Sequence, residues 1–255
     1  MILLNGDCLE LMKTLDDNSI DLVFCDLPYG QISASWDCKI DLEKFWVEIM
    51  RIKKLHTPIF FTTTTKYGVE LIQSAPKKCF FRYDLVWVKS AATGFLTSTR
   101  MPMRKHELVY VFYEKLPLYD LSSHKHKFKE SKGTKENGVC ENWSNNQVQR
   151  LYYYDEDGNK LDGYQGKGEK QTKYDPPLPD SILEVNSTRG KHHSTEKPVA
   201  LMEWVLKYYS KEGDTILDPT MGSGSTGVAC KNLNREFIGI ELDEDIYGIA
   251  LGRLT

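Results

Sequence analysis

The chain has 255 residues, of which 40% are hydrophobic and 27% charged, and its formal net charge is −3. These values describe an ordinary globular protein with a full core, and the small net charge excludes a chain that holds a polyanion by its overall charge. The six cysteines form no Cys-x-x-Cys pair and no apolar run approaches about 20 residues, so we expect reduced thiols, no metal, no membrane span and a cytoplasmic location.

Strands and helices alternate over the first 113 residues, because apolar residues fall at strand spacing in some segments and at helical spacing in others. The expected strands are 2–4, 20–25, 58–62, 83–88 and 108–112, and the expected helices are 8–15, 42–55 and 66–74. Arg104, His106 and Glu107 lie just before the last of these strands and are interpreted as structural pairs. The alternation predicts an α/β fold with a mostly parallel sheet and helices on both faces.

The segment 114–192 loses this alternation. It holds a lysine-rich run at 124–135, a tyrosine run with an Asp-Gly turn at 151–159, and a proline-rich linker at 175–180. The tyrosine run and its turn predict a hairpin. A stretch of this length without core periodicity favours an inserted module over a plain loop.

Regular α/β alternation returns near His193 and continues to the last residues. The expected helices are 198–209, 227–233 and 245–254, and the expected strands are 215–217 and 237–240. The sequence therefore predicts two α/β segments with the irregular segment between them.

The strand at 20–25 ends in an unusual turn, FCDLPYG at 24–30. Apolar residues lead to Asp26, and Leu27, Pro28 and Tyr29 then change the direction of the chain. A carboxylate and an aromatic ring thus stand side by side where a strand stops. On these residues alone, a binding corner and a capped turn with a surface tyrosine are both open.

A second strand end, ILDPTMGSGSTGVAC at 216–230, leads into a Gly-rich turn and a helix. Such turns let the backbone approach a ligand beyond the carboxyl end of a strand. The turn lacks the lysine of a phosphate loop and the third glycine of the dinucleotide motif. Asp218 suits an amine and Glu241, at the end of the next strand, suits ribose hydroxyls, so S-adenosylmethionine fits. A turn that serves only helix–strand packing is the alternative.

A third motif, HSTEKP at 193–198, precedes the Gly-rich turn. With the tetrad Asp26–Tyr29 and the loop Asp218–Ser225, it resembles the amino-methylating DNA methyltransferases, adenine-N6 and cytosine-N4, in the β-type motif order. The resemblance implies a Rossmann-like methyltransferase sheet, circularly permuted in motif order. It further implies a catalytic half at 1–113, a target-recognition insert at 114–192 and a cofactor-binding half at 193–255.

The resemblance gives each tetrad residue a role. The Asp26 side chain and the Leu27 carbonyl would accept the two protons of an exocyclic amine, which exposes the nitrogen lone pair to the methyl-sulfonium of the cofactor. Pro28 would stiffen the turn, and Tyr29 would stack on a base rotated out of the duplex. Leu27 and Thr220 depart from the usual proline and aromatic residue of the family motifs.

The resemblance also implies the cofactor contacts, with Asp26 bordering both ligands. The expected set is Asp7, Cys8, Asp26, Thr195, Lys197, Asp218, Gly222, Ser223, Gly224 and Glu241. Within this set, Asp7 would bind the adenine amine of the cofactor and Lys197 its methionyl carboxylate. Two alternatives stay open: Asp7 as the N-cap of the following helix, and Lys197 as a surface lysine before a helix that starts with proline.

DNA contacts are expected outside the two main motifs. Trp36 follows the tetrad on a loop, where it could border the target-base pocket or simply pack. Lys125, Lys127 and Lys129 stand at alternate positions and could follow the phosphates of DNA. A solvated lysine face is the alternative interpretation of these three residues.

The resemblance therefore implies a restriction–modification type of enzyme that moves a methyl group from S-adenosylmethionine to N6 of adenine in duplex DNA by base flipping. Adenine is favoured over cytosine N4 because an acid opens the tetrad where many cytosine enzymes carry serine. Methylation of RNA and a nucleotide-binding module without turnover stay open as alternatives. The nearly neutral charge leaves room for a homodimer or a partner subunit in DNA binding.

Overall fold

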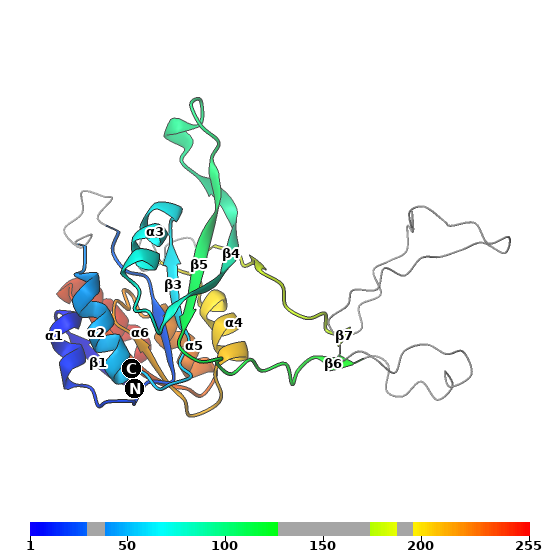
Figure 1. Ribbon diagram of the computed structural model, residues 1–255. Helices are drawn as coiled ribbons and strands as arrows, with labels where there is room; N and C mark the ends of the chain where they lie inside the picture. Colours follow the sequence, from blue (N-terminus) through cyan, green and yellow to red (C-terminus); the bar gives the residue numbers. More distant parts are fainter. Residues whose placement is uncertain (30–38, 127–173, 188–195) are drawn as a thin grey trace, which may run out of the picture. The chain divides into compact units, whose positions relative to one another are not determined.

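The computed structural model describes residues 1–29, 39–126, 174–187 and 196–255 (Figure 1). The chain divides into two units, a larger one of Met1–Asp120 and Asp180–Thr255 and a smaller one of Leu121–Pro179. In the smaller unit, β6 (Lys125–His126) pairs antiparallel with β7 (Tyr174–Asp175). The division falls inside the segment 114–192, whose role as a target-recognition insert stays a prediction.

The larger unit is built on an eight-stranded sheet with the order β1-β10-β9-β2-β3-β5-β4-β8. Its strands are β1 (Ile2–Asn5), β2 (Leu22–Cys25), β3 (Ile59–Thr63), β4 (Phe80–Thr93), β5 (Arg104–Tyr113), β8 (Ile182–Glu184), β9 (Thr215–Asp218) and β10 (Glu236–Glu241). Neighbouring strands are parallel, except that β5 runs antiparallel to both β3 and β4. The predicted mostly parallel sheet is confirmed.

The described helices lie mostly where apolar residues repeat at helical spacing. They are α1 (Cys8–Leu11), η1 (Met12–Thr14), α2 (Leu42–Ile52), α3 (Thr65–Ser74), η2 (Phe95–Thr97), α4 (Val199–Tyr209), α5 (Ser225–Asn232) and α6 (Glu244–Leu254). Acidic caps fix the starts of α2 and α6: Asp41 accepts from the backbone N–H groups of Glu43 and Lys44, and Asp243 accepts from that of Ile246. Such caps satisfy N–H groups that have no partner within the helix.

Helices cover both faces of the sheet, as two neighbouring residues of β3 demonstrate. Successive side chains of a strand point to opposite faces. The Phe61 ring packs against Phe45 and Trp46 of α2, with ring centroids 6.1 and 5.6 Å apart. The Phe60 ring packs instead against Tyr209 of α4, at 5.0 Å. The sheet is therefore buried between α2 on one side and α4 on the other.

The hairpin of β4 and β5 is longer than the sequence predicts. Arg104, His106 and Glu107 were expected to precede the last strand, but they lie inside β5 and continue its pairing with β4. The first part of β5, before Leu108, does not face the core, so it carries no alternating apolar residues from which a strand could be predicted. Backbone pairing with β4 extends the strand there. Among the residues that the structure describes, none of the helices is both long enough and apolar enough to cross a bilayer.

Candidate functional site

Four acidic residues stand at or just after the carboxyl ends of neighbouring parallel strands of the sheet. Asp7 comes just after β1, Glu241 ends β10, Asp218 ends β9 and Asp26 follows β2 directly. Because the carboxyl ends of parallel strands meet at one edge, these residues form a row along the edge where α/β folds bind ligands. The two motifs touch there: the Thr220 hydroxyl donates to the backbone carbonyl of Asp26 at 3.2 Å.

The Asp26 carboxylate, at the head of the tetrad, is held by three donors. Its Oδ2 atom accepts from the Lys197 ammonium at 2.6 Å. Its Oδ1 atom accepts from the Tyr29 hydroxyl at 3.0 Å and from the Thr62 hydroxyl. Donors from three separate parts of the chain thus fix this carboxylate in one orientation.

Tyr29 is half-buried, which does not fit the alternative of a surface tyrosine on a capped turn. Its ring lies 5.2 Å from that of Tyr67, and its hydroxyl is 3.0 Å from both Asp26 Oδ1 and the carbonyl oxygen of Thr62. Burial, with a smaller contribution from the charge of Asp26, raises the pKa of Tyr29 well above its usual value. The ring is therefore held in place beside the carboxylate as a neutral phenol.

Leu27 explains why the tetrad tolerates a residue other than proline at its second position. Its side chain is almost completely buried and belongs to the main apolar cluster of the sheet. Packing in the core thus restrains the turn where a proline ring would otherwise do so. The group with the predicted function, the Leu27 carbonyl, belongs to the backbone and does not depend on the side chain.

Lys197 lies on the tetrad acid and extends its charge network to β5. Its ammonium is 2.6 Å from Asp26 and 3.6 Å from Glu107, and Glu107 in turn binds Lys89 at 2.9 Å. Burial alone would lower the pKa of Lys197, but the carboxylates of Asp26 and Glu107 outweigh it and raise that pKa above its usual value. The interpretation as a free surface lysine is wrong, and the predicted contact to a methionyl carboxylate stays a prediction.

The Gly-rich turn after β9 is organised by Asp218. Its Oδ1 atom accepts from the backbone N–H of Thr220 at 3.2 Å and its Oδ2 atom from the Thr226 hydroxyl at 2.6 Å. Gly222 and Gly224 have φ angles of 53° and 84°, in the left-handed region that favours glycine. A Cβ atom at Gly224 would also lie 3.0 Å from the Leu254 side chain, whereas one at Gly222 would meet no atom within 4 Å, so the steric demand for glycine is stronger at Gly224.

Asp218 carries the most informative electrostatics of the site. It is buried and its hydrogen bonds come from neutral donors, and burial raises its pKa to about 7. An ionised carboxylate in such surroundings gains from a cation close by. The amine and sulfonium of S-adenosylmethionine are cations of this kind, so the residues present fit that cofactor.

Glu241 closes the turn from the neighbouring strand. Its Oε2 atom accepts from the backbone N–H of Gly222 and its Oε1 atom from that of Asp243, both at 2.9 Å. Asp7 accepts from the N–H of Leu9 at 2.8 Å, so it is the N-cap of α1, and the predicted contact with the cofactor stays a prediction. Burial raises the pKa of the Cys8 thiol to about 12, so the thiol stays neutral and buried. The group of Cys8 that suits a ligand is therefore its backbone N–H.

Arg253, near the end of α6, is a site residue that the sequence did not reveal. Its Nη1 atom donates to the Ser223 carbonyl at 2.8 Å and to the Ser223 hydroxyl at 3.0 Å, and it pairs with Glu196 at 2.9 Å. It thus connects the HSTEKP motif with the Gly-rich turn. Nothing in the pattern of the terminal helix marks this arginine, because the contact spans 30 residues to Ser223 and 57 to Glu196.

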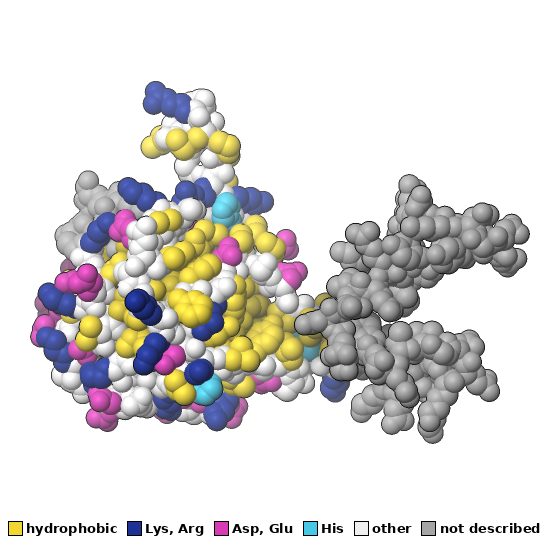
Figure 2. Space-filling view, viewed as in Figure 1, with side chains coloured by type: hydrophobic (Ala, Val, Ile, Leu, Met, Phe, Trp, Pro, Cys, Tyr) yellow, Lys and Arg dark blue, Asp and Glu magenta, His cyan; other side chains and the backbone are white. Residues whose placement is uncertain are grey.

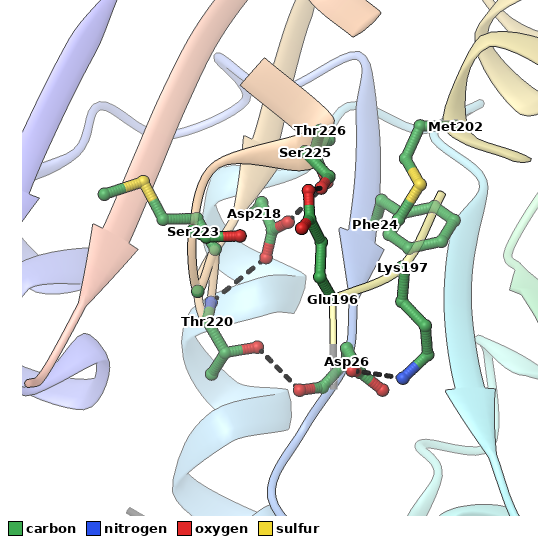
Figure 3. A pocket seen from close by; sticks show the side chains of 12 residues that line it. Phe24, Asp26, Glu196, Lys197, Met202, Asp218, Thr220, Ser223, Ser225 and Thr226 are labelled. Carbon is green, nitrogen blue, oxygen red and sulfur yellow. Dashed lines mark hydrogen bonds and ion pairs between the residues drawn. The ribbon is translucent and has the colours of Figure 1, made fainter. Parts of the chain in front are cut away.

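One pocket unites residues of all three motifs (Figure 3). It is lined by Phe24, Asp26, Glu196, Lys197, Met202, Asp218, Thr220, Met221, Gly222, Ser223, Ser225 and Thr226. Figure 3 shows the carboxylate of Asp26 with the Lys197 ammonium on one side, and Asp218 above it on the loop that carries Thr220. The predicted residues Trp36, Lys127, Lys129 and Thr195 lie outside the described residues, and Lys125 is an exposed residue of the smaller unit.

The sequence matches the family model described as DNA methylase over residues 20–251. It is 30% identical over 264 residues to the Type II methyltransferase M2.DpnII of Streptococcus pneumoniae, covering 100% of this chain and 89% of the relative. It is 27% identical over 266 residues to the Type II methyltransferase M.HpaI of Haemophilus parainfluenzae, covering 99% of this chain and 73% of the relative.

Two solved structures have a similar fold. The M1.HpyAVI complex with S-adenosylmethionine matches with a TM-score of 0.63 and 18% identity over 100% of this chain and 98% of its own. The PvuII DNA methyltransferase, described as cytosine-N4-specific, matches with a TM-score of 0.63 and 14% identity over 99% of this chain and 86% of its own. These similarities identify the sheet as Rossmann-like, of the methyltransferase kind.

Proposed function

Because the chain belongs to the DNA methylase family of N6-adenine and N4-cytosine amino-methyltransferases, we propose that it methylates N6 of adenine in duplex DNA, with S-adenosylmethionine as the methyl donor. The observation that carries this proposal is the single pocket that is lined by both Asp26 of the tetrad and Ser223 of the Gly-rich turn. A methyl donor and an acceptor amine need to meet in such a place.

The cofactor half of the site supplies complementary charge and polar groups. Asp218, when ionised, favours a cationic amino-acid tail, and Ser223 and Ser225 line the same pocket. Glu241 suits the ribose hydroxyls, and Asp7 with Cys8 suits the adenine ring, at the far end of the row of strand ends. When bound, S-adenosylmethionine supplies a methyl group on a sulfonium, which is an electrophile without further activation.

The tetrad supplies the acceptor groups for the target base. An exocyclic amine is a weak nucleophile because its lone pair is delocalised into the ring, and acceptors for both of its protons favour the pyramidal form that attacks. We assign one proton to the fixed Asp26 carboxylate and the other to the Leu27 carbonyl. Transfer of the methyl group would release the thioether S-adenosylhomocysteine, and the methylated nitrogen would lose one proton to solvent. The Asp26 carboxylate would stabilise the positive charge that develops on the nitrogen before this proton is lost.

Tyr29 supports the proposed extrusion of the base. Chemistry on the amino group requires the base outside the duplex, and an aromatic face beside the acceptor offers a place for it to stack. The bond from the Tyr29 hydroxyl to Asp26 fixes the position of the ring relative to the carboxylate that holds the amine. One pre-arranged unit thus provides both stacking and hydrogen bonding.

Adenine is favoured over cytosine because the tetrad opens with the acid Asp26. The test is transfer of tritiated methyl groups to unmethylated plasmid DNA, followed by mass spectrometry of the nucleosides. We expect 6-methyladenine. Detection of 4-methylcytosine would show that the target is N4 of cytosine and not N6 of adenine. Labelling of RNA without labelling of DNA would overturn the proposal.

Asp26→Ala provides the matched inactive protein for this assay. Transfer should fall by at least about 10²-fold, because an interaction that develops in the transition state is lost. Affinity for S-adenosylhomocysteine, measured by calorimetry, should change little. Asp17→Ala, an exposed acid of the same unit, serves as the control and should transfer normally. Retained transfer in Asp26→Ala would remove Asp26 from the mechanism.

A further inference from the structure

The strands β4 and β5 continue as a two-stranded ribbon beyond the end of β3 (Figure 1). The last residue of β3 to pair with β5 is Thr63, opposite Leu108, whereas β5 goes on pairing with β4 through Glu107, His106 and Arg104. We call the part of the ribbon from Lys89 to Glu107, with the turn η2 at its tip, the β4–β5 arm. Within the arm, after a register shift between Val88 and Thr93, the two strands pair again at Thr93 and Arg104.

The arm rises from the edge of the sheet that holds the site. β3 and β4 both run antiparallel to β5, so β4 runs in the same direction as β3 and passes the carboxyl edge where Asp26 lies. At the base of the arm, Glu107 binds Lys89 at 2.9 Å and approaches Lys197, the partner of Asp26, at 3.6 Å. The arm is thus anchored to the charge network of the tetrad.

The tip of the arm exposes large apolar side chains to solvent. Leu96 is 97% exposed, Phe95 79%, Met101 57% and Met103 47%. In Figure 2 the tip appears as a group of hydrophobic side chains with basic side chains beside it. Apolar side chains that stay in water do not stabilise the isolated chain. Exposed apolar groups of this kind mark surfaces that bind a partner.

The charge of the arm indicates which partner fits. Between Val88 and Glu107 the sequence has no acidic residue, although the chain as a whole has a net charge of −3. Arg100, Arg104 and Lys105 are exposed, and within the described ranges none of them forms an ion pair with a carboxylate. A second copy of the same arm would bring like charges together, so the pattern favours a polyanion over self-association.

We propose that the β4–β5 arm binds duplex DNA beside the target base. A two-stranded β-ribbon fits the major groove. The basic side chains contact phosphates, which position a protein on DNA, and the apolar tip contacts base edges and thymine methyl groups. The inference rests on the proposed function, since it assumes DNA as the substrate, and it adds a second DNA-binding element to the predicted insert.

The test uses the full-length chain with two changes in the arm. Phe95→Ser with Leu96→Ser removes the apolar tip, and Arg100→Gln with Arg104→Gln removes two positive charges. The affinity for a fluorescein-labelled, unmethylated duplex fragment is measured by anisotropy at several salt concentrations. We expect the dissociation constant to rise at least tenfold in each variant, and the slope of log K against log salt to fall by about 2 in the charge variant.

Matched changes far from the arm provide the controls. Val47 is 65% exposed on α2, so Val47→Ser removes a comparable apolar side chain. Lys77 and Lys78 precede β4 and thus lie at the opposite edge of the sheet, so Lys77→Gln with Lys78→Gln removes two charges there. These controls should bind DNA as the unchanged chain does. All variants should bind S-adenosylhomocysteine normally by calorimetry, which shows that the site is intact.

The possible failures can be told apart. If the unchanged chain methylates plasmid DNA but both arm variants bind DNA normally, the arm is not a DNA-binding element while the proposed function stands. If the arm variants instead change the molecular mass measured by light scattering, with DNA affinity unaffected, the tip is a surface for self-association and the inference is overturned. If the unchanged chain transfers no methyl group to DNA yet loses DNA binding with the arm changes, the proposed function fails and the arm inference survives.

Discussion

At the scale of single residues, the central feature is the ion pair between Lys197 and Asp26. The two residues are separated by 171 positions, yet their charged atoms lie 2.6 Å apart. A cation at this distance restrains the orientation of the carboxylate, which in the proposed mechanism accepts a proton of the target amine. The pairing suggests a positioning role for Lys197 as an alternative to the cofactor contact predicted for it.

Kinetics can separate these two roles of Lys197. If the lysine positions Asp26, Lys197→Gln should lower kcat by about 10-fold or more, with little change in KM for S-adenosylmethionine. Lys197→Arg should recover much of the loss, because a guanidinium also pairs with a carboxylate. If instead Lys197 binds the methionyl carboxylate, KM for the cofactor should rise with kcat nearly unchanged. Steady-state assays with saturating DNA provide the measurement.

Asp218 should make cofactor binding depend on pH. Because its pKa is raised to about 7, the ionised fraction grows from about a tenth at pH 6 to about nine tenths at pH 8. If the ionised form binds the cationic amino-acid tail, affinity for S-adenosylmethionine should increase roughly tenfold over this range. Calorimetry at pH 6, 7 and 8 measures it. Asp218→Asn should bind weakly and flatten the dependence, and an equally steep dependence in that variant would contradict the assignment.

At the scale of secondary-structure elements, the terminal helix α6 fixes the Gly-rich turn through Arg253. We expect Arg253→Met to weaken S-adenosylmethionine binding by about 10-fold, since the Ser223 carbonyl and hydroxyl lose their charged donor. Calorimetry measures the affinity and a thermal melt the stability. Arg51→Met is the control, because Arg51 makes similar contacts to the Leu15 and Met12 carbonyls away from the pocket. It should lower the melting temperature but leave cofactor affinity unchanged.

The sequence predicts the elements that the core determines and misses those that only backbone pairing determines. Strands such as β2 and β9 end at an acid and a turn, so both the element and the site residue after it could be predicted. The extension of β4 to Thr93 could not, because exposed residues such as Ser90 and Thr93 have no apolar alternation. The contacts of Arg253 and Lys197 depend on the tertiary fold and leave no local pattern either.

At the scale of the whole molecule, the larger unit holds both halves of the site although they come from opposite ends of the chain. In its sheet, β10 and β9 from the end of the chain lie between β1 and β2 from the beginning. The two α/β segments, which are far apart in the sequence, therefore form one continuous sheet. Of the smaller unit, Leu121–Pro179, none of the described residues, 121–126 and 174–179, is among those that line the pocket. Cofactor binding and target recognition are therefore expected to be separable.

Replacement of Leu121–Pro179 by a flexible Gly–Ser linker tests this separation. The shortened chain should fold and bind S-adenosylmethionine with an affinity within about threefold of the full chain, because the large apolar cluster of the sheet lies in the larger unit. Methyl transfer to plasmid DNA should be lost or spread over many sequences. Calorimetry and sequencing of methylated sites measure the two effects, and transfer with unchanged site preference would contradict a recognition role for the smaller unit.

The hydrogen bond from the Thr220 hydroxyl to the Asp26 carbonyl has a consequence for the two ligands together. In the proposed mechanism the peptide after Asp26 receives the amine and the loop that carries Thr220 lies beside the methyl donor. This hydrogen bond joins the two, so we expect a shift in one to be transmitted to the other. Thermodynamic reciprocity then requires that whatever factor the cofactor adds to the affinity for DNA, DNA adds equally to the affinity for the cofactor. We therefore expect the binding of DNA and the binding of the cofactor to be coupled through this hydrogen bond.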